Sequence, residues 1–151
     1  MKTFNIIVYW FLQLTWGSLM TILGFFVVLF CKIFCKGVIH KNGCTIICEV
    51  GGNWGGLEFG AFALCGGYTT KCPDKKWFEY TRRHEFGHSI QNIIFGPFTL
   101  FVVWIPSAIR YNYRNWRTKK GLGNATEYDS IWFERTATDW GTKIINKIEK
   151  E

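Results

Sequence analysis

Residues 77–95 read WFEYTRRHEFGHSIQNIIF and are followed directly by Gly96 and Pro97. Apolar residues recur along this run at mixed helical spacings, and a Gly-Pro pair ends helices. We therefore predict one helix over residues 77–95. It contains the pattern HExxH from His84 to His88, so the two imidazoles fall on one face of the helix, one turn apart.

Two histidines with this spacing can bind one Zn²⁺ ion, and the glutamate between them, Glu85, is then a candidate general base. Catalytic zinc sites keep three protein ligands and one open position, so a third ligand must come from elsewhere in the chain. The one other histidine in the sequence is His40. Glu134 is better placed, because it falls within a helix predicted over residues 128–147, with Thr126 as its N-cap.

Glu134 lies on the packing face of this second helix. The other members of its stripe are apolar or small: Ile131, Thr138, Gly141, Ile145 and Ile148. A charge buried there without a partner costs several kcal/mol, and a metal ion would supply the partner. An ion pair with Arg82 or Arg83 is the alternative. The small residues would let the helix approach the HExxH helix closely, which favours coordination.

At these residues the chain resembles the gluzincin class of zinc metallopeptidases, in which a glutamate on a later helix completes HExxH. More narrowly, HEFGHSIQ followed by FGP, IPS and ERTA is similar to small, largely uncharacterised bacterial membrane-associated proteins with an HE-aromatic-GH motif. The resemblance covers residues 77–141. It implies that His84, His88 and Glu134 bind zinc. It also implies that Glu85 is the general base.

Two supporting roles stay open within the resemblance. Many gluzincins carry an aspartate four residues after the third ligand, where this chain has Thr138, so the group that supports the histidines is unassigned. A developing oxyanion also needs a hydrogen-bond donor. The candidates are Tyr128, Tyr111 and His40.

Residues 37–70 are rich in glycine and β-forming residues and predict a small antiparallel sheet ahead of the HExxH helix. A turn at residues 41–43 separates two strands, at residues 38–39 and 44–50, and residues 57–64 read as another strand. In zincins an edge strand lies beside the metal and can bind an extended peptide by strand addition. The substrate-edge candidates are Trp54, Gly55, Gly56 and Leu57. The alternative is that this strand only covers the helix.

Residues 4–31 contain no charged side chain over 28 positions. As one helix they would span about 42 Å, more than the roughly 30 Å hydrocarbon core of a bilayer. We therefore predict a transmembrane helix within a membrane anchor of residues 1–36. A cleaved signal peptide is the alternative, but the apolar run is too long for one.

Charged residues around this helix predict its orientation. Lys2 alone precedes it, whereas three lysines follow closely, at positions 32, 36 and 41. The positive-inside rule therefore places the remaining domain, residues 37–151, in the cytoplasm. Together with the bacterial resemblance, this predicts a protein of the bacterial inner membrane.

A second uncharged run, residues 89–109, is interrupted by Gly96-Pro97 and by Pro106. Basic residues flank it on both sides, which predicts a membrane-embedded or interfacial segment rather than a clean second crossing. Residues 110–120 then combine five basic residues with aromatic ones. Beside an apolar segment this composition is typical of a surface that faces anionic lipid, so nucleic-acid binding is the less favoured explanation of the net charge of +7.

The sequence thus predicts an α+β protein with an N-terminal transmembrane helix, a small antiparallel sheet, a zincin-like HExxH helix and a C-terminal helix carrying the third ligand. The predicted function is zinc-dependent hydrolysis of a peptide or protein substrate, either free or bound to the membrane. The alternative is a non-catalytic membrane protein in which structural zinc or an ion pair joins two helices and the protein binds lipid or a partner. His40 or one of the six cysteines as a fourth ligand would decide for that alternative.

Overall fold

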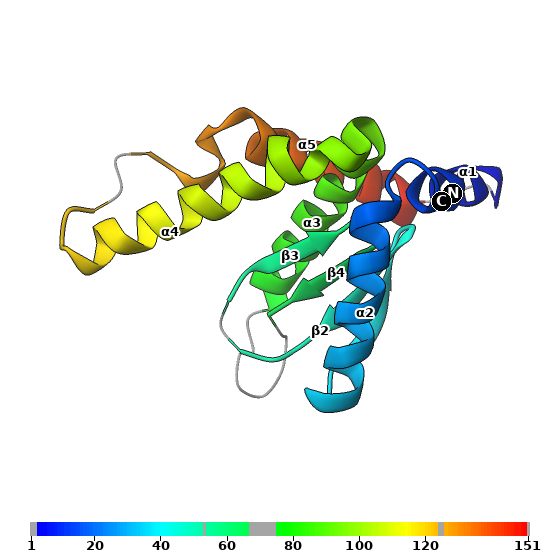
Figure 1. Ribbon diagram of the computed structural model, residues 1–151, viewed down its shortest axis with the longest axis horizontal. Helices are drawn as coiled ribbons and strands as arrows, with labels where there is room; N and C mark the ends of the chain where they lie inside the picture. Colours follow the sequence, from blue (N-terminus) through cyan, green and yellow to red (C-terminus); the bar gives the residue numbers. More distant parts are fainter. Residues whose placement is uncertain (1–2, 53, 67–74, 124–125, 151) are drawn as a thin grey trace.

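A computed structural model of the chain describes residues 3–52, 54–66, 75–123 and 126–150, which form an α+β fold (Figure 1). The described helices are α1 Thr3–Leu14, α2 Ser18–Phe34, α3 Lys75–Phe95, α4 Ile105–Lys119 and α5 Trp132–Lys150, with short helical turns at η1 Gly96–Phe98, η2 Leu100–Trp104 and η3 Tyr128–Ser130. The strands are β1 Val38–Asn42, β2 Thr45–Glu49, β3 Gly56–Phe59 and β4 Phe62–Cys65. Lys2, which entered the orientation prediction, and Cys72 lie outside the described residues.

The sheet is mixed, so the prediction of an antiparallel sheet was wrong. Its strand order is β1-β2-β4-β3: two antiparallel hairpins are joined through a parallel pairing of β2 with β4. Residues 57–64, predicted as one strand, are divided between β3 and β4. The division falls at Gly60, which has a φ of +65° and turns the chain within two residues. This turn makes β3 an edge strand.

Side chains alternate along the strands and face two different helices. Cys48, Phe62 and Leu64 belong to a cluster with residues of α2, whereas Ile47, Ala63 and Cys65 cluster with Phe78 of α3. The helices α2 and α3 therefore cover opposite faces of the sheet (Figure 1). Gly56 and Glu58 pair with Cys65 and Ala63, so they share the face that α3 covers.

The N-terminal apolar run is not one helix, contrary to the prediction of a single span. α1 and α2 meet at an angle of 94°. At the bend, the side-chain amide of Asn92 donates to both Gln13 Oε1 and the Gly17 carbonyl, and a Cβ on Gly17 would lie only 2.4 Å from that amide nitrogen. Buried polar partners on α3 therefore redirect the chain at the bend, which an apolar run by itself does not predict.

Among the described residues, no single helix is long and apolar enough to cross a bilayer. Two bent pairs meet the criteria of length and composition only when each is taken together: α1 with α2, and residues 75–98 with 100–119, between which the chain bends by 116°. The second bend lies in the run 89–109, at the predicted Gly96-Pro97 interruption. The two bends pack together, since a Cβ on Gly96 would lie 2.3 Å from the Trp16 ring.

α5 crosses α3 with backbone against backbone. A Cβ on Gly87 would lie 1.9 Å from the Ala137 carbonyl oxygen, and one on Gly141 would lie 1.8 Å from the Arg83 carbonyl oxygen. Glu134, on the same face of α5, is completely buried. The predicted close approach of the two helices is therefore confirmed.

The start of α5 differs from the prediction. The helix begins at Trp132, because residues 128–130 form the 3₁₀ turn η3 and Ile131 is extended. Thr126 is therefore not its N-cap; its hydroxyl instead accepts a hydrogen bond from Arg110 at 3.4 Å.

Candidate metal centre

Three side-chain atoms from α3 and α5 converge at one point inside the protein. The Nε2 atoms of His84 and His88 are 3.0 Å apart, and they lie 3.1 and 3.3 Å from Oε2 of Glu134. A tetrahedral ion with bonds of about 2.0–2.1 Å holds its ligand atoms about 3.3 Å apart. The three buried residues can therefore hold a single metal ion.

The hydrogen bonds behind the imidazoles fix which nitrogen faces this point. His88 Nδ1 lies 2.8 Å from Gln91 Oε1, and the Gln91 amide nitrogen donates to the Phe133 carbonyl at 2.7 Å. The Gln91 oxygen can only accept, so His88 Nδ1 carries the hydrogen and the neutral ring keeps a lone pair on Nε2.

His84 is arranged in the same way by α5. Its Nδ1 lies 2.9 Å from Thr138 Oγ1, and that hydroxyl donates to the Glu134 carbonyl at 3.2 Å. The hydroxyl oxygen then accepts from Nδ1, which leaves the lone pair of His84 on Nε2. Thr138 thus fills the supporting position that the sequence had left unassigned, and Gln91 is the equivalent residue behind His88.

The Glu134 carboxylate is divided between two tasks. Ser107 Oγ donates to Oε1 at 2.5 Å, and the Tyr128 hydroxyl lies 3.3 Å from the same oxygen. The other oxygen, Oε2, is buried without a hydrogen-bond partner and faces the two histidines. Burial alone would raise the pKa of Glu134, but the adjoining imidazoles and Ser107 outweigh it and hold the pKa well below its usual range.

No arginine completes the site, so the alternative of an arginine ion pair for Glu134 was wrong. Arg82 binds Glu79 and Glu149, and Arg83 binds Glu149. Both arginines therefore neutralise charge at the far end of α5. Among the described residues, the histidines are the basic groups that face the Glu134 carboxylate.

Two more carboxyl groups, those of Glu85 and Glu58, lie near the histidines and have raised pKa values. Burial raises the pKa of Glu85. The two histidines lower this pKa and Glu134 raises it, and the net shift is upward. Burial also raises the pKa of Glu58 to about 8, with Glu85 adding to it. Burial would lower the pKa of His88, but Glu134, Glu85 and Glu58 outweigh it and raise the value to about 9. Three carboxyl groups around two imidazoles favour the binding of a cation.

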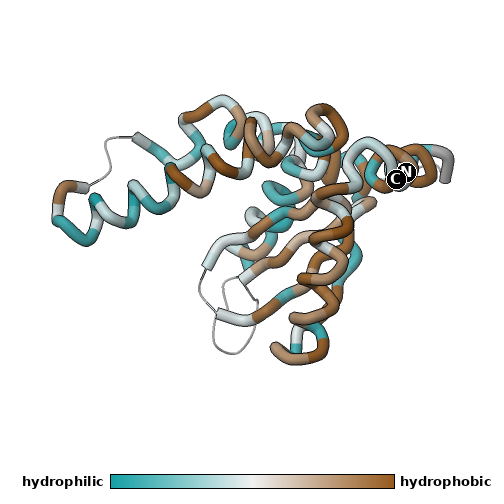
Figure 2. Tube along the Cα trace, viewed as in Figure 1, coloured by the Kyte–Doolittle hydropathy of each residue, from teal (hydrophilic) through white to brown (hydrophobic). Residues whose placement is uncertain are grey.

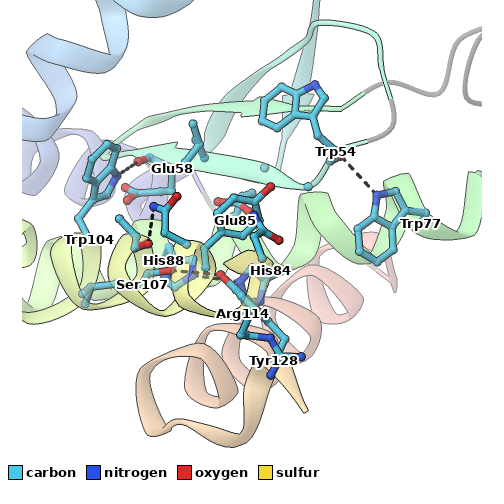
Figure 3. A pocket seen from close by; sticks show the side chains of 18 residues that line it. Trp54, Glu58, Trp77, His84, Glu85, His88, Trp104, Ser107, Arg114 and Tyr128 are labelled. Atoms are coloured by element: carbon cyan, nitrogen blue, oxygen red, sulfur yellow. Dashed lines mark hydrogen bonds between the residues drawn. The ribbon is translucent and has the colours of Figure 1, made fainter. Parts of the chain in front are cut away.

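The cluster borders a cavity of about 610 Å³ between β3, α3 and α4 (Figure 3). Trp54 and Trp77 frame one end, where the Trp77 indole nitrogen donates to the Trp54 carbonyl at 3.4 Å. Trp104 closes the other end and donates to the Glu58 carbonyl at 3.1 Å. Glu85 lies between the two ends.

The predicted substrate edge does lie at the cavity. Its lining includes all four candidates: Trp54, Gly55, Gly56 and Leu57. Gly56 lies against the carboxylate of Glu85, because a Cβ at this position would be 2.5 Å from Oε1 of that side chain. Glycine at position 56 therefore makes the space in which Glu85 lies.

Two of the three oxyanion candidates also line the cavity. Tyr128 lies beside Glu134, and Tyr111 is half exposed on α4. His40 does not line it: the residue lies on β1, at the opposite edge of the sheet, where its Nε2 is 2.8 Å from Glu49. The structure thus separates His40 from the metal centre.

Sequence reasoning missed the functional residues Glu58, Gln91 and Ser107. Gln91 follows His88 by three residues, a helical spacing that could have identified it. Glu58 and Ser107 reach the site only through the fold, so local spacing carries no signal for them. Comparison with protein-family models, curated proteins and solved structures found no match for this chain.

Proposed function

We propose that the protein is a membrane-associated zinc metallopeptidase in which His84, His88 and Glu134 hold the metal and Glu85 is the general base. The observation that carries this proposal is a buried three-ligand cluster that opens on a cavity containing Glu85. Its ligand spacing suits the bond lengths of zinc, and both histidines have their lone pairs on the ligating nitrogens. When bound, zinc supplies Lewis acidity that lowers the pKa of a water ligand and polarises a carbonyl.

The chain's own groups have separate tasks in this reaction. Glu85 accepts a proton from the attacking water and returns it to the leaving amine; its raised pKa makes it a stronger base than an exposed glutamate. Burial and the nearby Glu134 raise the pKa of Tyr128 to about 12, so its hydroxyl stays protonated at neutral pH. Tyr128, beside Glu134, and Tyr111, at the cavity wall, are the two oxyanion-donor candidates that the cavity brings near Glu85.

An extended peptide fits the edge strand. β3 pairs with β4 on one side only, and residues at its start line the cavity beside Glu85. Backbone pairing with β3 would hold a peptide by its main chain whatever its sequence. Trp54 and Trp77 at one end of the cavity then provide apolar contacts for its side chains.

The non-catalytic alternative has less support. A structural zinc site is closed by four protein ligands. The metal-ligating cluster found among the described residues contains three, with neither His40 nor a cysteine. The open position favours a catalytic role.

Exposed apolar residues support attachment to a membrane. The outer side of α2 exposes large apolar side chains along its whole length: Leu19, Ile22, Leu23, Phe25, Phe26, Leu29, Phe30, Ile33 and Phe34. Figure 2 shows most of the same helix as hydrophobic. Such a surface in contact with water is costly, and a bilayer would cover it. In this proposal the protein inserts into the membrane through the two bent helix pairs instead of a single spanning helix. The proposal keeps the bacterial inner membrane as the location, with the metal centre on the cytoplasmic side.

The test separates metal binding from chemistry. Glu85→Gln should retain zinc and lower the hydrolysis of a peptide library by about a hundredfold or more, because the general base is lost. His88→Ala should lose zinc and activity together. Glu127→Gln, at an exposed position, is the matched control and should match the wild type.

Metal content and hydrolysis are measured on the same detergent-purified or liposome-bound samples. Loss of zinc in Glu85→Gln would contradict the assigned roles. A zinc-loaded wild type that cleaves nothing would bring the non-catalytic alternative forward.

A further inference from the structure

The segment from η1 to the start of α4 has two different sides. Its outer side carries Phe98, Phe101, Ile105 and Ile109, at spacings of three and four residues, with exposed fractions of 60, 64, 40 and 65%. Its inner side carries Trp104 and Ser107, which line the cavity. One helical layer therefore separates the metal centre from whatever covers the apolar side.

The inner side is firmly joined to the site. Trp104 donates to the carbonyl of Glu58 at 3.1 Å, and Ser107 donates to Glu134. Val103, which also lines the cavity, is buried. Whatever contacts the outer side of this segment therefore lies at a fixed distance from the cavity.

The charge along α4 indicates what covers the outer side. After Ile109 the helix contains Arg110, Arg114, Arg117 and Lys119, and it contains no acidic residue. Exposed aromatic residues lie among them: Tyr111, Tyr113 and Trp116. Figure 2 shows α4 changing from hydrophobic near its start to hydrophilic at its far end. This order, apolar and then aromatic with basic, is that of a segment leaving hydrocarbon through anionic headgroups.

A second apolar surface adjoins this one. Trp16, at the bend before α2, packs on Gly96 of η1. The apolar outer sides of α2 and of η1–α4 therefore meet at the two bends. A bilayer is broad enough to cover both at once, which a short peptide partner is not.

The cavity lies at the level where α4 changes character. The residues on α4 that line it begin at Ser107 and Ala108, beside the last exposed apolar residue, Ile109. They continue through Asn112 to Asn115, among the basic residues. With Val103 and Trp104 of η2 also in its lining, the cavity spans the level at which the apolar stripe gives way to the basic residues.

We infer that the cavity opens at the level of the lipid headgroups and that its substrates are peptide segments directly adjoining a membrane anchor. The substrate class rests on the proposed peptidase function, whereas the depth of the cavity does not. A short tether holds a cleavage site at this level, whereas a long one lets it diffuse away, so effective concentration falls with tether length.

The depth is tested without activity. A fluorescent amino acid replaces Phe101, Ile109, Tyr113 or Lys120, one at a time, in protein bound to phosphatidylglycerol–phosphatidylethanolamine liposomes with spin-labelled acyl chains. Quenching should be strongest at Phe101 and weakest at Lys120. Equal quenching at the four positions, the reverse order, or no binding to the liposomes would overturn the inference.

The substrate class is tested with one cleavable sequence, either free or joined to a transmembrane helix by spacers of about 5, about 15 or about 30 residues. In liposomes the shortest spacer should be cleaved at least about tenfold faster than the longest. Ile109→Asp should abolish this preference and leave cleavage of the free peptide in detergent unchanged. Equal rates at all spacer lengths would overturn the substrate class and leave the peptidase function in place; no cleavage of any substrate would overturn both.

Discussion

Hydrogen bonds to two neutral groups, the Thr138 hydroxyl and the Gln91 amide, orient the histidines of the metal centre. A carboxylate in either position would add negative charge to a site that already holds Glu58, Glu85 and Glu134. Neutral supports orient the rings without that repulsion. Neutral side chains at these two positions therefore suit a site to which β3 contributes a further carboxyl group, that of Glu58.

Adjacent glycines at the cavity differ in what they tolerate. Gly56→Ala should destabilise the protein by about 1–3 kcal/mol and lower peptidase activity by at least about tenfold, because its Cβ would displace the Glu85 carboxylate. Gly55→Ala should leave the stability unchanged, since nothing lies within 4 Å of the Cβ it would gain. Chemical denaturation and peptide hydrolysis measure the two effects. Identical behaviour of the two variants would contradict the packing of Glu85 on Gly56.

The buried carboxyl group of Glu58 makes stability depend on pH. Its pKa is about 8 in the folded protein against an ordinary value of 4.5, so the folded state alone holds this proton between those values. Stability should fall as the pH rises from about 5 to about 8, because deprotonation leaves a buried charge. In chelator-treated protein, Glu58→Gln should flatten this fall in the free energy of unfolding. The exposed control Glu127→Gln should keep it; a Glu58→Gln profile as steep as the wild type would contradict this account.

Local spacing predicts only part of the site. Helical periodicity correctly brought His84, His88 and Glu134 together, because each position is fixed within its own helix and both helices present small residues to each other. Glu58 and Ser107 depend on how β3 and α4 are placed in three dimensions. The choice of His40 as a candidate was wrong for the same reason. It was considered because it is a histidine, but the fold places it on β1, across the sheet from His84 and His88.

At the scale of helices, the crossing of α3 and α5 builds the metal centre. Gly87→Ala or Gly141→Ala should separate the two helices, because either Cβ would lie under 2 Å from a carbonyl oxygen of the opposite helix. We expect a loss of about 1–3 kcal/mol in stability and weaker zinc binding. Asp139→Ala, on the exposed side of α5, is the control. Thermal unfolding and zinc titration provide the measurements, and unchanged zinc affinity in both glycine variants would exclude the crossing as the basis of the site.

The first hairpin of the sheet was predictable, whereas the second hairpin and the joining of the two were not. The first hairpin follows from a turn signal between two β-forming runs, and β1 and β2 form there, although Lys41 and Asn42 belong to β1 and the turn falls at residues 43–44. The parallel contact of β2 with β4 depends on residues that carry the chain across to the far edge of the sheet. In the same way, hydropathy identified the N-terminal run as apolar, but the bend at Gly17 depends on Asn92, which is distant in sequence.

For the whole molecule, hydrophobic rather than ionic attachment to membranes is the expectation. The protein should stay in the membrane fraction in high salt and in carbonate, because apolar contacts are not screened. Phe26→Asp, on the exposed side of α2, should increase its release. Lys143→Asp is the control. It changes the net charge by more than Phe26→Asp does, but it lies on α5 and should not increase the release of the protein. Complete release of the wild type by salt would argue for a purely electrostatic contact.

The contact between α1 and α3 also affects how the protein is made. Gln13 donates to the Ser89 carbonyl and accepts from Asn92, across 76 and 79 positions of sequence. At roughly 5–20 residues per second, the ribosome needs on the order of 4–15 s to synthesise the residues between these partners. During that time the apolar N-terminal residues have left the ribosome without their native partners. A bilayer or a chaperone can bind them first, and the contact between α1 and α3 forms only after residues 89–92 have been synthesised.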